Sequence, residues 1–169
     1  DDVKSLLKGW HDNDNGRLKV MLAPRYAGAC SMKLMKKCAE MSKAENLLVQ
    51  THLAENPSEV EYIKALFPNH SSYTEIYKKA GFLNNRSIFV HSIYLNDTEI
   101  KMLKDSGAKL THCPSSNRFL QSGIMPLHKL WHKGFDIGLG TDVAGGYSLS
   151  MITEAREAIE TSKTWNIIN

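Results

Sequence analysis

Short apolar runs alternate with helical patterns along the chain, and this alternation is the main guide to its fold. Apolar runs of strand length occupy five segments: 18–23, 47–49, 87–90, 108–111 and 135–139. Helical patterns occupy the segments around them: 2–10, 32–44, 57–66, 73–80, 98–106, 125–133 and 148–163. Regular alternation of strand and helix is typical of a parallel α/β protein with right-handed crossovers.

Five strand–helix units are more than half of an eight-unit barrel, so the pattern predicts part of a TIM-like (β/α)8 barrel. The alternative is an open, doubly wound sheet. A glycine-rich first turn of the G-x-G-x-x-G or P-loop kind would favour that alternative, and the sequence contains neither motif. Because no linker or low-complexity stretch divides the chain, we expect residues 1–169 to form one α/β domain without an internal boundary.

Polar side chains follow the predicted strands at the point where each strand ends. In chain order they are Arg25, His52, His91, His112 and Asp142. Imidazole and carboxylate are ligand types of hydrolytic zinc sites, and the ends of parallel strands share one rim. Taken singly, His52 is more often a hydrogen-bonded structural histidine, and Asp142 is equally well a helix cap. Their shared position on the rim favours a single site.

Glu55 lies three residues after His52, in the loop that leaves the strand. This spacing allows a metal-binding histidine with a proton-carrying carboxylate beside it. The alternative is a carboxylate in the first turn of a helix, where the helix dipole favours negative charge. We interpret Ser115 and Ser116 as capping or turn residues, because the sequence has no G-x-S-x-G turn.

The composition of the chain is that of a globular domain and argues against a nucleic-acid partner. Hydrophobic residues make up 42% of the chain and charged residues 23%, which is ordinary for a globular domain. A formal charge of +3 without a basic cluster argues against a nucleic-acid partner, and no apolar run is long enough to span a membrane. Three unpaired cysteines favour a reducing compartment, so we expect a cytoplasmic protein.

Four motifs together resemble the metal-dependent amidohydrolase superfamily. They are residues 50–55 (QTHLAE), 90–91 (VH), 111–117 (THCPSSN) and 140–142 (GTD). Three further stretches resemble the guanine-deaminating branch of that superfamily: 24–31 with its PRY and CS, 71–83 with its spaced tyrosines, and 140–148 (GTDVAGGYS). The resemblance extends over essentially the whole chain. The H-x-H pair of the superfamily's first strand does not occur, which implies the C-terminal-side part of the barrel of a longer enzyme.

The resemblance implies a zinc enzyme that hydrolyses guanine to xanthine and ammonia and forms a homodimer at full length. It implies that His52 and Asp142 bind zinc, that Glu55 shuttles protons and that His91 polarises the substrate. Glu55, His91 and Asp142 are the expected catalytic residues. Arg25 and Tyr26 would hold the purine together with His91. Two alternatives are a related amidohydrolase acting on another aminated heterocycle, and a non-catalytic barrel fragment that only binds a partner.

Overall fold

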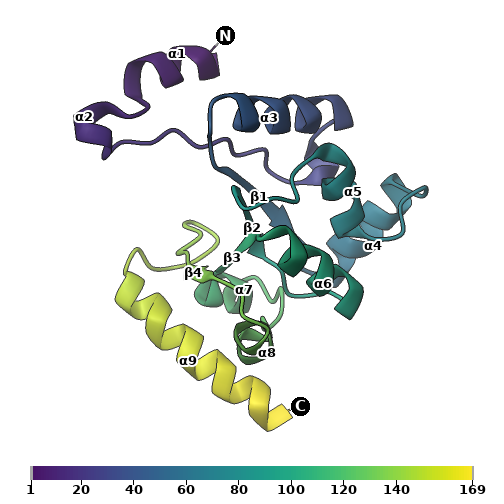
Figure 1. The fold of residues 1–169 in the computed structure, drawn as a ribbon. Helices are drawn as coiled ribbons and strands as arrows, with labels where there is room; N and C mark the ends of the chain where they lie inside the picture. Colours follow the sequence, from purple (N-terminus) through teal and green to yellow (C-terminus); the bar gives the residue numbers. More distant parts are fainter. Residues whose placement is uncertain (1, 169) are drawn as a thin grey trace.

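A wholly parallel sheet of four strands forms the centre of the computed structural model, which describes residues 2–168 (Figure 1). The strands lie in chain order: β1 (Val49–Leu53), β2 (Ser87–His91), β3 (Lys109–His112) and β4 (Ile137–Leu139). Leu53 pairs with His91, and His112 pairs with Leu139. Because the strands end side by side, the residues that follow them collect at one edge of the sheet.

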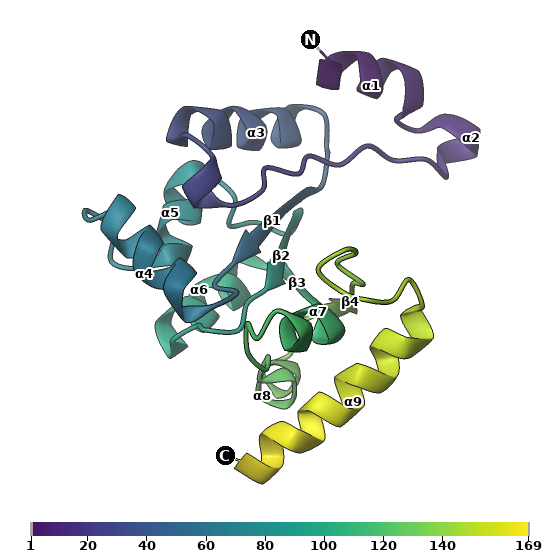
Figure 2. The same cartoon turned by 180° about the vertical axis from the view of Figure 1, so that it is seen from behind.

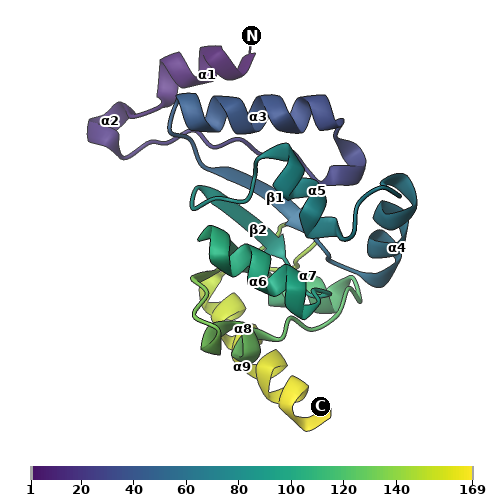
Figure 3. The ribbon, with the colours of Figure 1, turned by 45° about the vertical axis from the view of Figure 1, so that its right-hand side comes forward.

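Helices connect the strands and pack against the sheet, as seen from behind in Figure 2 and from the side in Figure 3, where α5 and α6 lie in front of the strands. They are α1 (Asp2–Trp10), α2 (Asn13–Gly16), the 3-10 helix η1 (Ala27–Ala29), α3 (Met32–Ala44), α4 (Pro57–Leu66), α5 (Tyr73–Ala80), α6 (Asp97–Ser106), α7 (Pro114–Phe119), α8 (Leu127–His132) and α9 (Met151–Ile168). Ser31, Asn56 and Ser72 cap α3, α4 and α5 by accepting a backbone N–H from the first turn.

Burial alternates along the strands. In β1, Val49 and Leu53 are buried, whereas Gln50 and His52 are partly exposed. On the buried face, Thr51 Oγ1 lies 3.1 Å from the phenol oxygen of Tyr77, which belongs to the covering helix α5. The ring centroids of Phe89 and Tyr77 are 5.4 Å apart. One covered face and one partly open face are what a sector of a (β/α) barrel presents, so the predicted α/β partial barrel is confirmed.

The prediction of a strand at residues 18–23 is wrong, and the sheet has four strands where the sequence predicts five. Only Leu22 pairs, through a parallel bridge to Val49. Its amide and carbonyl both bond to the neighbouring segment, at 2.9 and 2.8 Å. The ladder does not continue past it, because Pro24 has no N–H to donate. The sequence pattern also does not predict α7, which follows β3 directly.

The segment before α3 is held against β1 by the phenol of Tyr77. Its oxygen accepts the backbone N–H of Ala27 at 3.0 Å and donates to the carbonyl of His52 at 2.7 Å. The amide of His52 in turn donates to the carbonyl of Arg25 at 2.9 Å. These bonds place Arg25 and Tyr26 next to the end of β1.

Candidate active site

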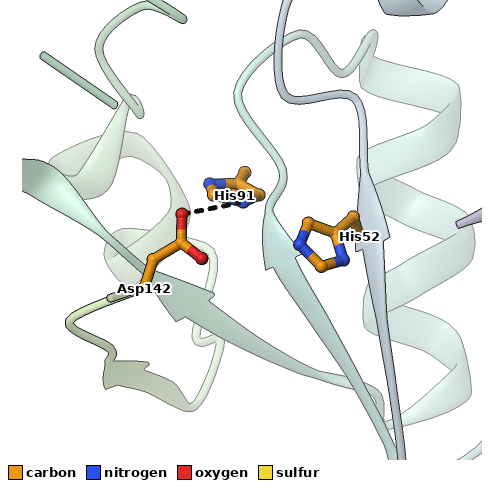
Figure 4. A group of neighbouring side chains, drawn as sticks. All are labelled: His52, His91 and Asp142. Atoms are coloured by element: carbon orange, nitrogen blue, oxygen red, sulfur yellow. Dashed lines mark ion pairs between the residues drawn. The ribbon is translucent and has the colours of Figure 1, made fainter. Parts of the chain in front are cut away.

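Three side chains with metal-binding atoms converge at the carboxyl edge of the sheet (Figure 4). His52 comes from β1, His91 ends β2, and Asp142 lies in the loop after β4. One ligand atom from each lies within 4.8 Å of the other two, and Asp142 Oδ2 is 3.9 Å from His91 Nε2. The centroids of the two imidazole rings are 5.2 Å apart. The structure thus brings these three sequence-predicted residues to one point.

Hydrogen bonds orient both imidazoles toward this point. His52 Nδ1 lies 2.7 Å from the carbonyl oxygen of Arg25, which can only accept, so Nδ1 carries a proton and, in the neutral imidazole, Nε2 keeps its lone pair. His91 Nδ1 lies 2.8 Å from Asn117 Oδ1, and its Nε2 is buried with no hydrogen-bond partner among residues 2–168. Metal-binding histidines usually give their second N–H to an oxygen acceptor. The donor set therefore fits a divalent ion such as zinc.

The backbone at the site adopts an uncommon conformation. Ala54, His91 and Asp142 have φ values of 49°, 69° and 47°, in the left-handed region that residues with a Cβ adopt at a cost. Such conformations cluster at functional sites, where the surrounding structure enforces them. Each of these residues turns the chain away from a strand end.

Two glycines allow the loop after Asp142 to fold back on the site. A Cβ at Gly145 would lie 2.9 Å from Asp142 Oδ2, and a Cβ at Gly146 would lie 2.0 Å from the carbonyl oxygen of Thr141. The amide of Gly146 also donates to the carbonyl of Asp142 at 2.8 Å. This close approach explains the small residues after Asp142, and no helix begins there, so the helix-cap alternative for Asp142 is wrong.

Glu55 lies beside the histidines and ahead of α4. The hydroxyl of Ser122 donates to Glu55 Oε1 at 2.8 Å, and Oε2 is 3.7 Å from His91 Nε2. The Glu55 side chain is 19% exposed, so it remains open to water. Because α4 begins at Pro57 with Asn56 as its cap, Glu55 is not in the first turn of that helix.

An open cleft of about 520 Å³ adjoins the three converging side chains. Its walls include Arg25, Tyr26, His52, Glu55, Tyr62 and Asp142. The guanidinium carbon of Arg25 lies 6.0 Å from the centroid of the Tyr26 ring. The cleft thus combines a forked cationic donor, two tyrosine rings and three carboxylates, the third being that of Glu59.

The polar groups that end β3 do not join this cluster. His112 is buried, and neither of its ring nitrogens has a hydrogen-bond partner within the described part of the chain. Burial, and secondarily the neighbouring imidazole of His91, lower the pKa of His112 to about 4, so its imidazole is neutral at neutral pH. Burial, and next the carboxylate of Asp142, raise the pKa of the Cys113 thiol to about 12.

Sequence reasoning missed the residues that hold the site in place. The capping interpretation of Ser115 and Ser116 is wrong, because their hydroxyls donate to Glu154 Oε1 and Asp142 Oδ2, both at 2.6 Å. Asn117 contacts His91. The available signal was a run of three small polar residues, beginning three positions after β3, a strand whose neighbours carry reactive groups at their ends.

The chain matches a protein-family model and is similar in sequence to several guanine deaminases. Residues 1–167 match the model of the amidohydrolase family. The probable guanine deaminase of Schizosaccharomyces pombe is 39% identical over 148 residues, and the guanine deaminase of Mus musculus is 38% identical over 146 residues. These alignments cover 88% and 86% of this chain but 28% and 32% of the two relatives. The chain therefore spans about a third of the length of the curated relatives it matches.

A solved structure shows the same fold. The crystal structure of guanine deaminase from C. acetobutylicum, with guanine bound in its active site, matches with a TM-score of 0.91 and 32% sequence identity. The match covers 96% of this chain and 39% of that protein. The parallel sheet and its helices are thus similar, over nearly the whole chain, to a part of that larger fold.

Proposed function

Because the chain belongs to the amidohydrolase family, we propose that it carries the metal-binding and proton-transferring part of a guanine deaminase site, which hydrolyses guanine to xanthine and ammonia. The convergence of His52, His91 and Asp142 beside a cleft is the observation that carries this proposal. Relatives at 38–39% identity named guanine deaminase support guanine as the substrate.

Zinc is the metal that we assign to this site, with His52 and Asp142 as its ligands from this chain. When bound, a zinc ion supplies the Lewis acidity that activates water for hydrolysis near neutral pH. His91 lies close enough to be a third ligand. We assign it to the substrate instead, as the family resemblance implies, and the metal content of a His91→Gln variant separates the two roles.

Glu55 moves protons in the proposed reaction. Ser122 holds its Oε1, which leaves Oε2 available to take a proton from water and pass it to the leaving amine. Asp142 is the second carboxylate at the same point and can accept a further proton. Proton delivery is required because ammonia leaves far more readily than an amide ion.

Arg25 and Tyr26 hold the purine in the cleft. The guanidinium group offers planar, paired donors to a carbonyl oxygen and a ring nitrogen, and an aromatic ring offers a face for stacking. Both residues line the cleft next to His52 and Glu55. His91 would complete the contact through Nε2, the ring nitrogen that faces Glu55 and Asp142.

A substrate panel tests this function in the complete protein that carries these residues. Ammonia release is measured with guanine, adenine, cytosine and an aminotriazine, and we expect the highest kcat/KM for guanine. A clear preference for another compound would favour the alternative amidohydrolase. No turnover of any of them in zinc-loaded protein would favour a fragment that only binds a partner.

A metal assay tests the ligand assignment. We expect Asp142→Ala to lose both zinc and activity, because a ligand and a proton acceptor disappear together. Asp136→Ala is the matched control, since Asp136 is exposed and pairs with Lys109 at the other end of β4. Full zinc occupancy of Asp142→Ala would rule out the ligand role.

We also propose a cytoplasmic homodimer at full length. Cys30, Cys38 and Cys113 form no disulfide, which fits a reducing compartment. Within residues 2–168, no helix combines the length and the apolar character needed to cross a membrane. Ile152 and Ile159 on α9 are exposed and offer apolar area for a subunit contact. Cross-linking of the complete protein, followed by mass determination, tests the dimer.

A further inference from the structure

A short polar segment after β3 contacts three ionisable groups of the site, which are Glu55, His91 and Asp142. It runs from residue 115 to residue 122, through most of α7 and the turn that follows. Four of its side chains are almost completely buried: Ser115, Ser116, Asn117 and Ser122. Buried polar groups are costly unless they are hydrogen-bonded, so their bonds identify what the segment does.

Each of three side chains in this segment bonds a different group of the site. Ser116 Oγ donates to Asp142 Oδ2 at 2.6 Å, and Ser122 Oγ donates to Glu55 Oε1 at 2.8 Å. The oxygen Oδ1 of Asn117 lies 2.8 Å from His91 Nδ1. These groups follow three different strands, so one segment spans the site.

The segment is itself fixed at both ends. The amide and hydroxyl of Ser115 both donate to the buried carboxylate of Glu154 on α9, at 3.2 and 2.6 Å. At the other end, Ser122 donates its amide to the carbonyl of Asn117 at 2.8 Å, and its own carbonyl accepts the phenol of Tyr94 at 2.7 Å. The positions of Ser116, Asn117 and Ser122 are thus set by α9 and by the loop after β2.

The contact between Asn117 and His91 has a chemical consequence. An amide oxygen has no proton, so His91 must carry one on Nδ1 to make this bond. In its neutral form, the imidazole then presents the lone pair of Nε2 toward Glu55 and Asp142. The opposite tautomer would present an N–H there and would keep a bond to Asn117 only if the amide turned its Nδ2, which is buried without a partner among residues 2–168, toward Nδ1.

We propose that residues 115–122 are a positioning segment and that Asn117 holds His91 in the tautomer protonated at Nδ1. Ser116 and Ser122 orient Asp142 and Glu55 in the same way. The catalytic consequence rests on the proposed function, whereas the tautomer is a property of the chain alone. Groups that orient site residues in this manner typically contribute about 10- to 100-fold to metal affinity or activity.

The tautomer is measured first, without any assay of activity. Nitrogen-15 magic-angle-spinning NMR of the histidine-labelled chain distinguishes protonated from unprotonated ring nitrogens and tolerates association of the sample. Comparison with a His91→Gln sample assigns the signals. We expect His91 to be protonated at Nδ1 and bare at Nε2. A proton found at Nε2 with Nδ1 bare would overturn the proposal, even if guanine were turned over.

Variants of Asn117 then test the consequence in the complete, zinc-loaded protein. Asn117→Asp keeps an oxygen acceptor for Nδ1, whereas Asn117→Leu has similar size and no acceptor. We expect Asn117→Leu to contain both tautomers and to lower kcat about 10- to 100-fold with little change in KM. Asn117→Asp should keep the Nδ1 proton and recover part of kcat.

If Asn117 had a purely structural role, the melting temperature, the His91 spectrum and kcat would respond differently. Ser42→Ala is the control, because Ser42 is buried and bonds to the carbonyl of Leu47 at the opposite end of β1. It should lower the melting temperature without changing the His91 spectrum or kcat. If Asn117→Leu does the same, the positioning role is wrong. If guanine is not a substrate but the tautomer responds to Asn117 as expected, the proposed function fails and the positioning of His91 stands.

Discussion

His52 and His91 are neighbours in the site, but their orientation comes from different kinds of acceptor. A backbone carbonyl accepts from His52, whereas a side-chain amide faces His91. The carbonyl of residue 25 is present whatever the side chain there, and the amide of Asn117 is not. A substitution at position 117 can therefore change the orientation of His91, whereas a substitution at position 25 leaves in place the carbonyl that orients His52.

Glu55→Gln tests proton transfer at the level of one residue. Glutamine keeps the shape and still accepts from Ser122, but it cannot carry a proton. We expect the variant to retain zinc and guanine binding and to lose at least about a hundredfold in kcat. Steady-state kinetics beside a zinc assay measures both quantities. Glu61→Gln on exposed α4 surface is the control, and a near-normal kcat for Glu55→Gln would contradict the shuttle role.

His112 should make stability depend on pH. Its pKa is about 4 in the folded chain against 6.5 for an ordinary histidine, so the unfolded chain binds the proton more readily between these values. Stability therefore falls as the pH drops from about 6.5 toward about 4, by about 2 kcal/mol between pH ~7 and pH ~5.

Urea unfolding of wild type and His112→Asn at these two pH values measures this effect. The variant should lose about 2 kcal/mol less than wild type over the same range. His132→Asn is the control, because His132 is exposed on α8. Equal pH dependence of wild type and His112→Asn would show that His112 is not the source.

Site residues could be predicted from the sequence where the type of side chain itself suggests metal binding or proton transfer. Histidine and carboxylate after an apolar run are conspicuous, so His52, His91, Asp142 and Glu55 stand out in the sequence. Asn117 and Ser122 do not, because small polar residues are common in turns. Their role depends on a hydrogen-bond partner 26 or 67 positions away.

At the scale of elements, the tight packing of the loop between β4 and α9 requires glycine at position 146. We expect Gly146→Ala to cost at least about 2 kcal/mol of stability and to reduce zinc content, since its Cβ would overlap the Thr141 carbonyl and move Asp142. Thermal melts and elemental analysis measure the two effects. Gly138→Ala on β4 is the control, because a Cβ there meets nothing within 4 Å. An unchanged melt for Gly146→Ala would contradict the tight packing of this loop.

Elements with local signals were predicted well, and elements fixed by tertiary contacts were not. The bounds of α5 and its Gly81 end follow from a cap, an apolar period and a glycine. The run at 18–23 looks like a strand, but only Leu22 finds a partner. α7 has six residues and no side-chain cap, so it leaves no helical period to detect.

At the scale of the whole molecule, the 169-residue chain should associate in solution. Large apolar side chains remain exposed on α9 and before it: Leu149, Ile152 and Ile167 are 78, 85 and 83% exposed. β4 also lies at an edge of the sheet, with β3 on one side only. Exposed apolar area and open strand edges favour association.

Sedimentation velocity over a range of concentrations measures this behaviour. We expect the average mass to rise with concentration and the rise to be smaller for the double variant Ile152→Lys, Ile167→Lys. Val3→Lys on α1 is the control for an added charge at a less exposed apolar site. A monodisperse monomer with a cooperative melt would count against a chain that is one sector of a barrel.

The backbone and the side chain of Arg25 contribute to the site in different ways, and this difference bears on how the ligand preference of the site can change. Its backbone carbonyl orients His52, while its side chain lines the cleft. Selection can therefore exchange the side chain at position 25 without disturbing the carbonyl that orients His52, the proposed metal ligand. A lineage that carries this arrangement can change its ligand preference through single, viable steps, because no intermediate has to lose that orientation.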